Sequence, residues 1–425
     1  MARLVGGPGN QTLTGIDNEA NDLFGDTDVT VNFRRGGNDT LLGGDNTGNL
    51  LVGDFGGSMN FSTGGRDSLT GGLNSRNVLF GDAAETMYAS VGGRDVLTGG
   101  LGGSNELYGE AYEMILSWGG NDILTVGAVG AGNILHGDAA IMRDSVGGND
   151  TLRGIGGLPH TNLFFGDART MTSSVGGRDN LVGGAGARTD NQLYGDAETM
   201  AFSLGGNDTV TGGAGARTNT LHGDAHTLTE SRGGNDHVVG GGSNRDELYG
   251  DGFRLISSTG GNDIVTAGTS VSNSLYGDAF EMLGSSRGGN DILRGASAGG
   301  NTLVGDASIG EAGVRGGNDR LVSAAGTADR MWGDFQEGAG TGGRDRFAFG
   351  EGNGQDSIFD FERTHDLIEL RGIEGVESFA DLDIQTVDTN NDNTLDSSVI
   401  GFGDNNSVTV YNVTNLAARD FLFHA

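Results

Sequence analysis

The chain has no cysteine, only 2 prolines in 425 residues, and low hydrophobic and aromatic fractions of 35% and 7%. Without cysteine, neither a disulfide framework nor a thiolate metal site can form. The low apolar content excludes one large globular core. It predicts instead that apolar burial is distributed along an axis, as in repeat proteins.

Long apolar runs are absent as well. Neither end of the chain carries the run of about 18 apolar residues that a membrane span needs, and the first seven residues lack the core of a signal peptide. We therefore expect no membrane insertion. The protein is either cytosolic or exported by a route that does not read the N-terminus.

Basic residues are scarce, since 25 Lys and Arg stand against 57 Asp and Glu and give a formal net charge of −32. This charge argues against nucleic acids and anionic membrane surfaces as partners. The predicted partners are cations.

Glycine is abundant, with 84 residues that follow no three-residue period, which excludes collagen. Many belong to a motif, Gly-Gly-Asn/Arg-Asp, that recurs at intervals of 26 to 29 residues. Such a regular period predicts stacked structural units. The acids of this first series are Asp39, Asp67, Asp95, Asp122, Asp150, Asp179, Asp208, Asp236, Asp263, Asp291, Asp319 and Asp345.

A second acidic series alternates with the first and follows a glycine in each unit. Its members are Asp26, Asp54, Asp82, Glu110, Asp138, Asp167, Asp196, Asp224, Asp251, Asp278, Asp306 and Asp334. Five residues before each acid stands Asn21, Asn49, Asn77, Asn105, Asn133, Asn162, Asn191, Asn219, Asp246, Asn273, Asn301 or Asp329. A few residues after it comes an apolar position occupied by Met59, Met87, Met114, Met142, Met171, Met200, Leu228, Leu255 and Met282.

The segments between these motifs are too short for helices and are interrupted by glycine pairs. We predict an all-β fold, a parallel β-roll or β-solenoid of about twelve coils with about 28 residues each. Residues 1–22 are expected to form an atypical capping repeat, with Gln11 where the acid belongs, and residues 23–345 the solenoid. Residues 346–425, where the period fails, are expected to form a β-rich C-terminal cap.

The first acidic series is the stronger candidate for calcium binding. Calcium takes six to eight oxygen ligands from carboxylates and backbone carbonyls, and glycine turns with φ > 0 let the backbone approach an ion. In the second series, Asp82, Asp138, Asp167, Asp196, Asp224 and Asp278 are candidate ligands, but an Asn ladder without an ion is the open alternative for that turn column. A further alternative is that the acids only cap turns, although stacked unscreened carboxylates oppose this.

The array resembles the RTX (repeats-in-toxin, hemolysin-type) calcium-binding β-roll family over roughly residues 5–425, and residues 176–186 and 191–197 look like two successive turns of that family. The resemblance implies a right-handed parallel β-roll with multiple Ca²⁺ ions in its turns. The 28-residue period departs from the family's nine-residue half-repeats, because residues 187–190 and 198–203 are inserted between the motifs. Coordination is therefore expected to differ, and the neutral amide of Asn191 stands where the family's second Asp is expected.

Two C-terminal segments carry further predictions. Asp388, Asn390 and Asp392 place oxygens at alternate positions, as in a short calcium loop, and an Asx-rich hairpin turn is the equal alternative. The ending, residues 420–425, is similar to signals read by type I exporters. This similarity implies a secreted protein that folds on meeting extracellular calcium.

One column in the second segment of each unit is largely aromatic, and it includes Phe80, Tyr108 and Tyr194. Exposed rings would form a sugar-stacking strip, whereas buried rings would form a second thin core against the methionines, which we favour.

The expected function is a secreted calcium-binding protein with a structural, surface or adhesive role, with an extracellular glycan or cell surface as a further partner. The alternative is a solenoid enzyme, a polysaccharide lyase, hydrolase or epimerase, but no nucleophile elbow, His-Glu-x-x-His or P-loop motif occurs.

Overall fold

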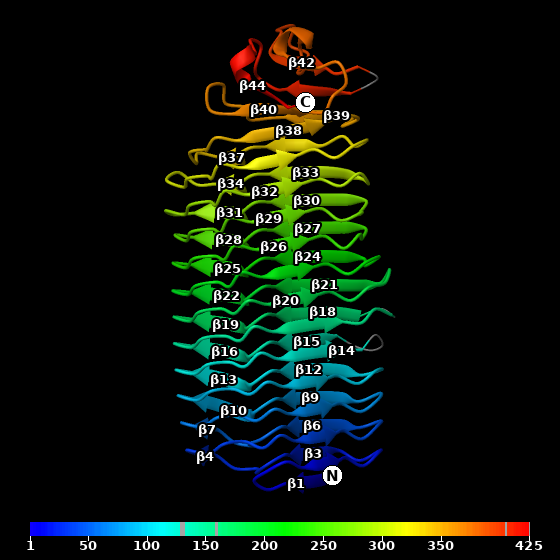
Figure 1. The fold of residues 1–425 in the computed structure, drawn as a ribbon, viewed down its shortest axis with the longest axis vertical. Helices are drawn as coiled ribbons and strands as arrows, with labels where there is room; N and C mark the ends of the chain where they lie inside the picture. The colour runs from blue at the N-terminus through cyan, green and yellow to red at the C-terminus, as the bar shows by residue number, and fades with distance from the viewer. Residues whose placement is uncertain (128–131, 158–159, 404–405, 425) are drawn as a thin grey trace. The chain divides into compact units, whose positions relative to one another are not determined.

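The computed structural model describes residues 1–127, 132–157, 160–403 and 406–424. It contains two units, Met1–Gly234 and Asn235–Ala425, which are described separately. Both are built from short β-strands that pair in parallel with the equivalent strands of the next turn, so the predicted parallel β-solenoid is confirmed, with about twelve turns along the chain (Figure 1). No helix among the described residues is long and apolar enough to cross a membrane.

Each coil of the first unit has three strands. The first strand of a coil follows the Gly-Gly-Asn/Arg-Asp motif, as β2 (Thr12–Thr14), β5 (Thr40–Leu42), β8 (Ser68–Thr70), β11 (Val96–Thr98), β14 (Ile123–Val126), β17 (Thr151–Gly154), β20 (Asn180–Val182) and β23 (Thr209–Thr211). The second strands are β1 (Ala2–Val5), β3 (Asn21–Phe24), β6 (Gly48–Val52), β9 (Arg76–Phe80), β12 (Ser104–Tyr108), β15 (Asn133–His136), β18 (His160–Phe165), β21 (Thr189–Tyr194) and β24 (Thr218–His222). The third strands are β4 (Val31–Asn32), β7 (Met59–Asn60), β10 (Ala83–Tyr88), β13 (Ala111–Ile115), β16 (Ala139–Arg143), β19 (Ala168–Thr172), β22 (Ala197–Ala201) and β25 (Ala225–Thr229).

The second unit repeats this pattern and then changes. Its first-strand series is β26 (His237–Val239), β29 (Ile264–Thr266), β32 (Ile292–Arg294), β35 (Arg320–Val322), β38 (Arg346–Gly350), β40 (Leu367–Arg371) and β44 (Phe421–His424). Its second series is β27 (Arg245–Tyr249), β30 (Ser272–Tyr276), β33 (Gly300–Val304), β36 (Arg330–Trp332), β39 (Gln355–Ile358) and β43 (Ser407–Val410), and its third is β28 (Gly252–Ile256), β31 (Ala279–Leu283), β34 (Ala307–Gly310) and β37 (Phe335–Gly338). The antiparallel strands β41 (Asp383–Val387) and β42 (Ser397–Gly401) join β43. Two short 3₁₀ helices are η1 (Phe379–Asp381) and η2 (Ala418–Asp420).

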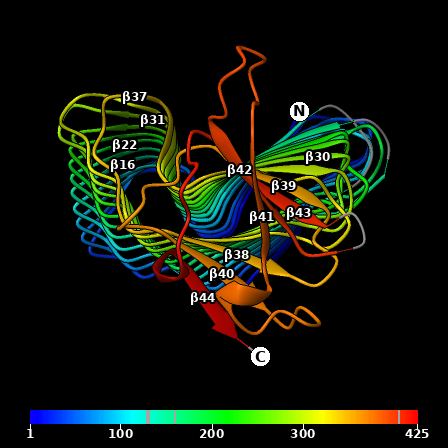
Figure 2. The ribbon, with the colours of Figure 1, turned by 90° about the horizontal axis from the view of Figure 1, so that it is seen from above.

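The register places like residues on like. In the pairing of β12 with β15, Asn105 faces Asn133 and Leu107 faces Leu135. Viewed from above, equivalent strands of the first unit lie over one another (Figure 2). A sequence period thereby becomes a set of straight columns, and each column concentrates one kind of side chain.

Three apolar columns fill the interior of the first unit, one from each strand of the coil. They include Leu97 on β11, Leu107 on β12 and Met114 on β13, all without exposed surface. Alternate residues of a strand point to opposite faces, which explains why single Leu or Met positions suffice in such short strands. Replacing one buried Leu or Met by Ala typically costs about 2–5 kcal/mol.

Candidate metal centre

The two acidic series converge in one stack instead of occupying separate turn columns. In the first unit four first-series acids, Asp39, Asp67, Asp95 and Asp122, each have a carboxylate oxygen close to those of two successive second-series acids, with all ligand atoms of a group within 4.8 Å of one another. The four groups found are Asp26, Asp39 and Asp54; Asp54, Asp67 and Asp82; Asp82, Asp95 and Glu110; and Glu110, Asp122 and Asp138. Asp54, Asp82 and Glu110 are thus each shared by two groups.

A ladder of hydrogen bonds fixes the first-series carboxylates. The N–H of Asp39 donates to Oδ1 of Asp67 at 2.6 Å, and the N–H of Asp67 donates to Oδ1 of Asp95 at 2.7 Å. The same bond, from one coil to the next, positions Asp122, Asp150, Asp179 and Asp208 in the first unit and Asp263, Asp291, Asp319 and Asp345 in the second, where the donor to Asp263 is Asp236.

The other oxygen of these carboxylates is buried without a hydrogen-bond partner. This holds for Oδ2 of Asp39, Asp67, Asp95, Asp122, Asp150 and Asp179 in the first unit and of Asp291, Asp319 and Asp345 in the second. Buried polar atoms are nearly always hydrogen-bonded, so a column of such atoms indicates a missing ligand.

Second-series acids are held from within their own coil. The second glycine of the Gly-Gly motif donates its N–H to the acid that precedes it, as Gly65 does to Asp54 at 2.7 Å. The acceptors in the other coils are Asp26, Asp82, Glu110, Asp138, Asp167, Asp196 and Asp224 in the first unit and Asp251, Asp278, Asp306 and Asp334 in the second. One carboxylate oxygen has no partner in Asp26, Asp54, Asp82, Glu110, Asp138, Asp278 and Asp306.

Glycine is required around the stack because other atoms lie too close for a Cβ. A Cβ on Gly25 would overlap the carbonyl oxygen of Gly53 and Oδ2 of Asp39, and one on Gly64 would overlap the Asp82 carboxylate. The expected φ > 0 is wrong for Gly64 and Gly65, which are not among the positive-φ residues. Close approach of backbone and carboxylates explains these glycines.

Burial makes the charged form of these acids costly. Burial raises the pKa of Asp67 to about 9, with the charges of Asp82 and Asp39 adding to it and the N–H of Asp39 opposing it. Burial raises the pKa of Asp138 and of Asp196 to about 7 and, with the charges of Asp319 and Asp334, that of Asp345 to about 10. The stack therefore needs either protons or cations to balance it.

The donor set fits a hard divalent cation. The converging groups offer carboxylate oxygens, with no sulfur or imidazole nitrogen among them. Oxygen-only sites suit calcium or magnesium, and calcium tolerates irregular geometry better than magnesium does.

The first acids of the first unit and the last acids of the second unit each lie next to side chains whose polar groups are hydrogen-bonded. At the start, Gln11 donates its backbone N–H to Asp39, accepts a hydrogen bond from Gly7 at its side-chain oxygen and donates its amide to the carbonyl of Gly9. In the second unit, Asp360 accepts from the N–H groups of Gly333 and Asp334, and Asp366 accepts from those of Asp345 and Glu362. These residues terminate the columns without a spare oxygen.

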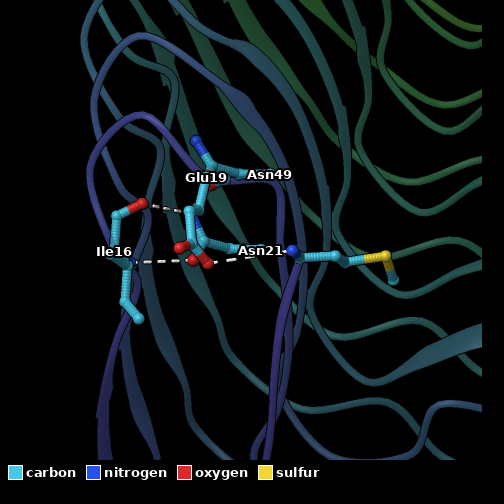
Figure 3. A network of polar contacts seen from close by, with 5 residues as sticks. Ile16, Glu19, Asn21 and Asn49 are labelled. Atoms are coloured by element: carbon cyan, nitrogen blue, oxygen red, sulfur yellow. Dashed lines mark hydrogen bonds and ion pairs between the residues drawn. The ribbon is translucent and has the colours of Figure 1, made fainter.

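The regularly spaced Asn residues form a separate column, in which Asp stands at positions 246 and 329. Asn21 donates its Nδ2 to Oδ1 of Asn49 at 3.0 Å and to the carbonyls of Ile16 and Glu19, and its Oδ1 accepts from the N–H of Ile16 (Figure 3). The ladder continues through Asn77, Asn105, Asn133, Asn162, Asn191 and Asn219, and in the second unit it runs from Asn273 through Asn301 to Asp329. The Asn ladder that the sequence suggested therefore exists, and it is separate from the two acidic series.

The C-terminal candidate loop lies in the hairpin between β41 and β42. Asp388 accepts backbone N–H groups from Asn391 and Asn393, and Asp392 donates its N–H to Asn390 and accepts from that of Thr394. This is the hydrogen bonding of an Asx-rich turn. A calcium site at Asp388, Asn390 and Asp392 stays a prediction.

The aromatic column is buried and forms a ladder of parallel rings. Tyr108 stacks on Phe80 at 4.6 Å and on His136 at 4.7 Å between ring centroids, and His136 stacks on Phe165 at 5.0 Å. The second thin core is confirmed, and an exposed sugar-stacking strip is excluded for this column. The predicted methionine partners are wrong. In two clusters of the column the covering side chains include Ala140 in the first unit and Phe253 and Phe280 in the second, whereas the methionines are buried outside these clusters.

Comparison of the chain with protein-family models and with curated protein sequences gives no match.

Proposed function

We propose that the chain is a secreted calcium-binding repeat protein that folds on calcium and serves a structural, surface or adhesive role. The observation that carries the proposal is the column of buried carboxylate oxygens without hydrogen-bond partners. The acids that bear them converge in groups of three. The resemblance of the Gly-Gly-Asn/Arg-Asp motif to calcium-binding β-rolls supports the same choice of ion.

In this proposal the hydrogen-bonded oxygen of each acid sets its position, and the unpartnered oxygen binds the ion. Asp95 would bind between Asp82 and Glu110, and Asp82 would be shared with the neighbouring site. Because each site takes ligands from successive coils, the binding free energy contributes directly to the folding free energy.

Export by a C-terminal signal would explain why folding depends on calcium binding. At low cytosolic calcium the coils stay unfolded, and at extracellular calcium they fold. In the folded chain β44 (Phe421–His424) pairs with β40, so folding before export would sequester the proposed signal.

The test is a calcium titration of the chelator-treated protein, followed by far-ultraviolet circular dichroism. We expect the β signal to be lost in chelator and restored by calcium, with magnesium at the same concentration as the matched control. Equilibrium dialysis with calcium then counts bound ions. A β signal that is unchanged by chelation, together with no calcium retained in dialysis, would contradict the proposal.

A further inference from the structure

A groove crosses successive coils of the first unit above the glycine pairs of the metal stack. It has a volume of about 590 Å³. One wall is formed by Arg35, Thr63 and Val91, and the other includes Arg66 and Arg94. The glycines of its floor are explained by the carboxylates beneath them, so the walls must provide any recognition.

Three arginines line this one groove. Among the described residues, no ion-pair or side-chain hydrogen-bond partner is found for the guanidinium groups of Arg35, Arg66 and Arg94, which are exposed. Some other outward arginines pair with an acid of an adjacent coil, as Arg169 does with Glu198 at 2.6 Å and Arg76 with Glu106 at 3.7 Å, whereas Arg178 has no such partner among the described residues. In a chain with 57 acids, three unpaired arginines that line the same groove suit an anionic ligand from outside the chain.

An exposed tryptophan continues one wall. Trp118 follows Thr63 and Val91 in a series of parallel bridges, and 54% of its surface is exposed. The same position holds Val146 and Val175 in the next coils. A large exposed ring beside cationic groups suits a ligand that has both an apolar face and negative charge.

We propose that this groove binds a linear acidic polysaccharide, with its carboxylates on Arg66 and Arg94 and a sugar ring on Trp118. Guanidinium groups match carboxylates with paired hydrogen bonds, and an aromatic ring packs against the apolar face of a sugar. Because Arg66 and Arg94 hold the same position in successive coils, the groove presents charge in a row, which fits a polymer with a repeated carboxylate. The proposal names a ligand class for the adhesive role proposed above. It rests on that proposed function only because the groove exists in the folded coils alone.

The chain itself supplies matched substitutions. Asn is the residue at the position of Arg66 and Arg94 in most coils, including Asn38 and Asn121, so Arg66→Asn with Arg94→Asn preserves the repeat. Arg178→Asn makes the same change at the same repeat position away from the groove. Trp118→Val introduces the residue found at positions 146 and 175.

The experiment measures binding of linear oligogalacturonate by calorimetry at a fixed free calcium concentration, with circular dichroism to verify folding. We expect about tenfold weaker binding for each arginine replaced, since a hydrogen bond to a charged group is lost, and no change for Arg178→Asn. Trp118→Val should weaken binding severalfold. Methyl-esterified oligomer, which lacks the charge, should not bind.

Equal binding by all variants, or no binding by the folded protein, would overturn the proposal. Binding of anionic phosphatidylserine vesicles with no binding of the oligomer would also overturn it and assign the groove to a lipid surface. The calcium response in circular dichroism is read separately. If the protein folds on calcium but does not bind the oligomer, the groove proposal is overturned and the metal proposal stands. If the protein folds without calcium and binds the oligomer, the metal proposal is overturned and the groove proposal stands.

Discussion

At the scale of single residues, each carboxylate of the stack divides its two oxygens between two tasks. In Asp95 one oxygen accepts the N–H of Asp67 and the other has no partner. The sequence identified Asp95 as a candidate ligand, but it left Asp26, Asp54 and Glu110 out of the candidates of the second series. Their recurrence after glycine was the available signal, and the geometry places all three in converging groups.

Asp95→Asn is expected to separate these tasks. The amide oxygen keeps the bond to Asp67, but the charge is lost, so the calcium midpoint of folding should rise roughly tenfold, because affinity depends on the number of charged ligands. In chelator, the Asn variant should be more stable than the wild type, because burial and the neighbouring acids raise the pKa of Asp95 and make its charged form costly. Calcium titration by circular dichroism measures both effects, with Asp144→Asn at an exposed acid as the control. An unchanged midpoint would exclude Asp95 as a ligand.

At the scale of elements, each second strand separates two kinds of core. Leu107 of β12 faces the interior, and Tyr108, the next residue, lies in the ring ladder on the opposite face. The sequence predicted the burial of this ladder. It could not identify its cover, because the residues that pack on it depend on how the third strand returns along the coil.

His136 makes the ladder sensitive to acid. Burial, followed by the charge of Arg169, lowers the pKa of His136 to about 3 from an ordinary value of 6.5. Above pH 6.5 His136 is neutral in both the folded and the unfolded chain, so its titration costs the fold nothing. As the pH falls from 6.5 towards 3, the unfolded chain binds a proton on this residue that the folded chain does not, so the folded state loses stability. His136→Phe copies Phe165 of the next coil and removes this titration. The free energy of unfolding of the variant minus that of the wild type should therefore be about 2 kcal/mol larger at about pH 5 than at about pH 8. Denaturant unfolding at both pH values, with saturating calcium, measures the difference, and equal differences at the two values would contradict it.

At the scale of the whole molecule, protons and calcium are expected to compete for the same carboxylates. The ordinary aspartate pKa of 3.8 rises in the folded chain to about 6 for Asp278, about 7 for Asp196 and about 9 for Asp67, chiefly through burial. Without metal the folded state therefore holds protons that the unfolded chain has released. This stability is full below pH 3.8 and is lost as the pH rises through the folded pKa values.

In chelator, the β signal should accordingly be stronger at about pH 5 than at about pH 8, and calcium should restore it at the higher pH. Calcium binding near pH 7 should also release protons, which calorimetry in buffers of different ionisation enthalpy detects. A chelated protein whose β signal does not change with pH, or calcium binding without proton release, would show that the stack is not balanced in this way.

The sequence by itself determined the period, the β class and the identity of each repeating column, because a parallel stack with constant register turns every repeated residue into a column. Only the tertiary structure decided that Asp39 meets Asp26 and Asp54 in one stack, that Asn49 belongs to a different ladder and which residues cover Tyr108. The separation in sequence between residues half a coil apart does not determine the distance between their side chains in space. Closure of the three strands into a coil brings the carboxylates together, and the hydrogen bonds of that coil determine which of their oxygens have no partner.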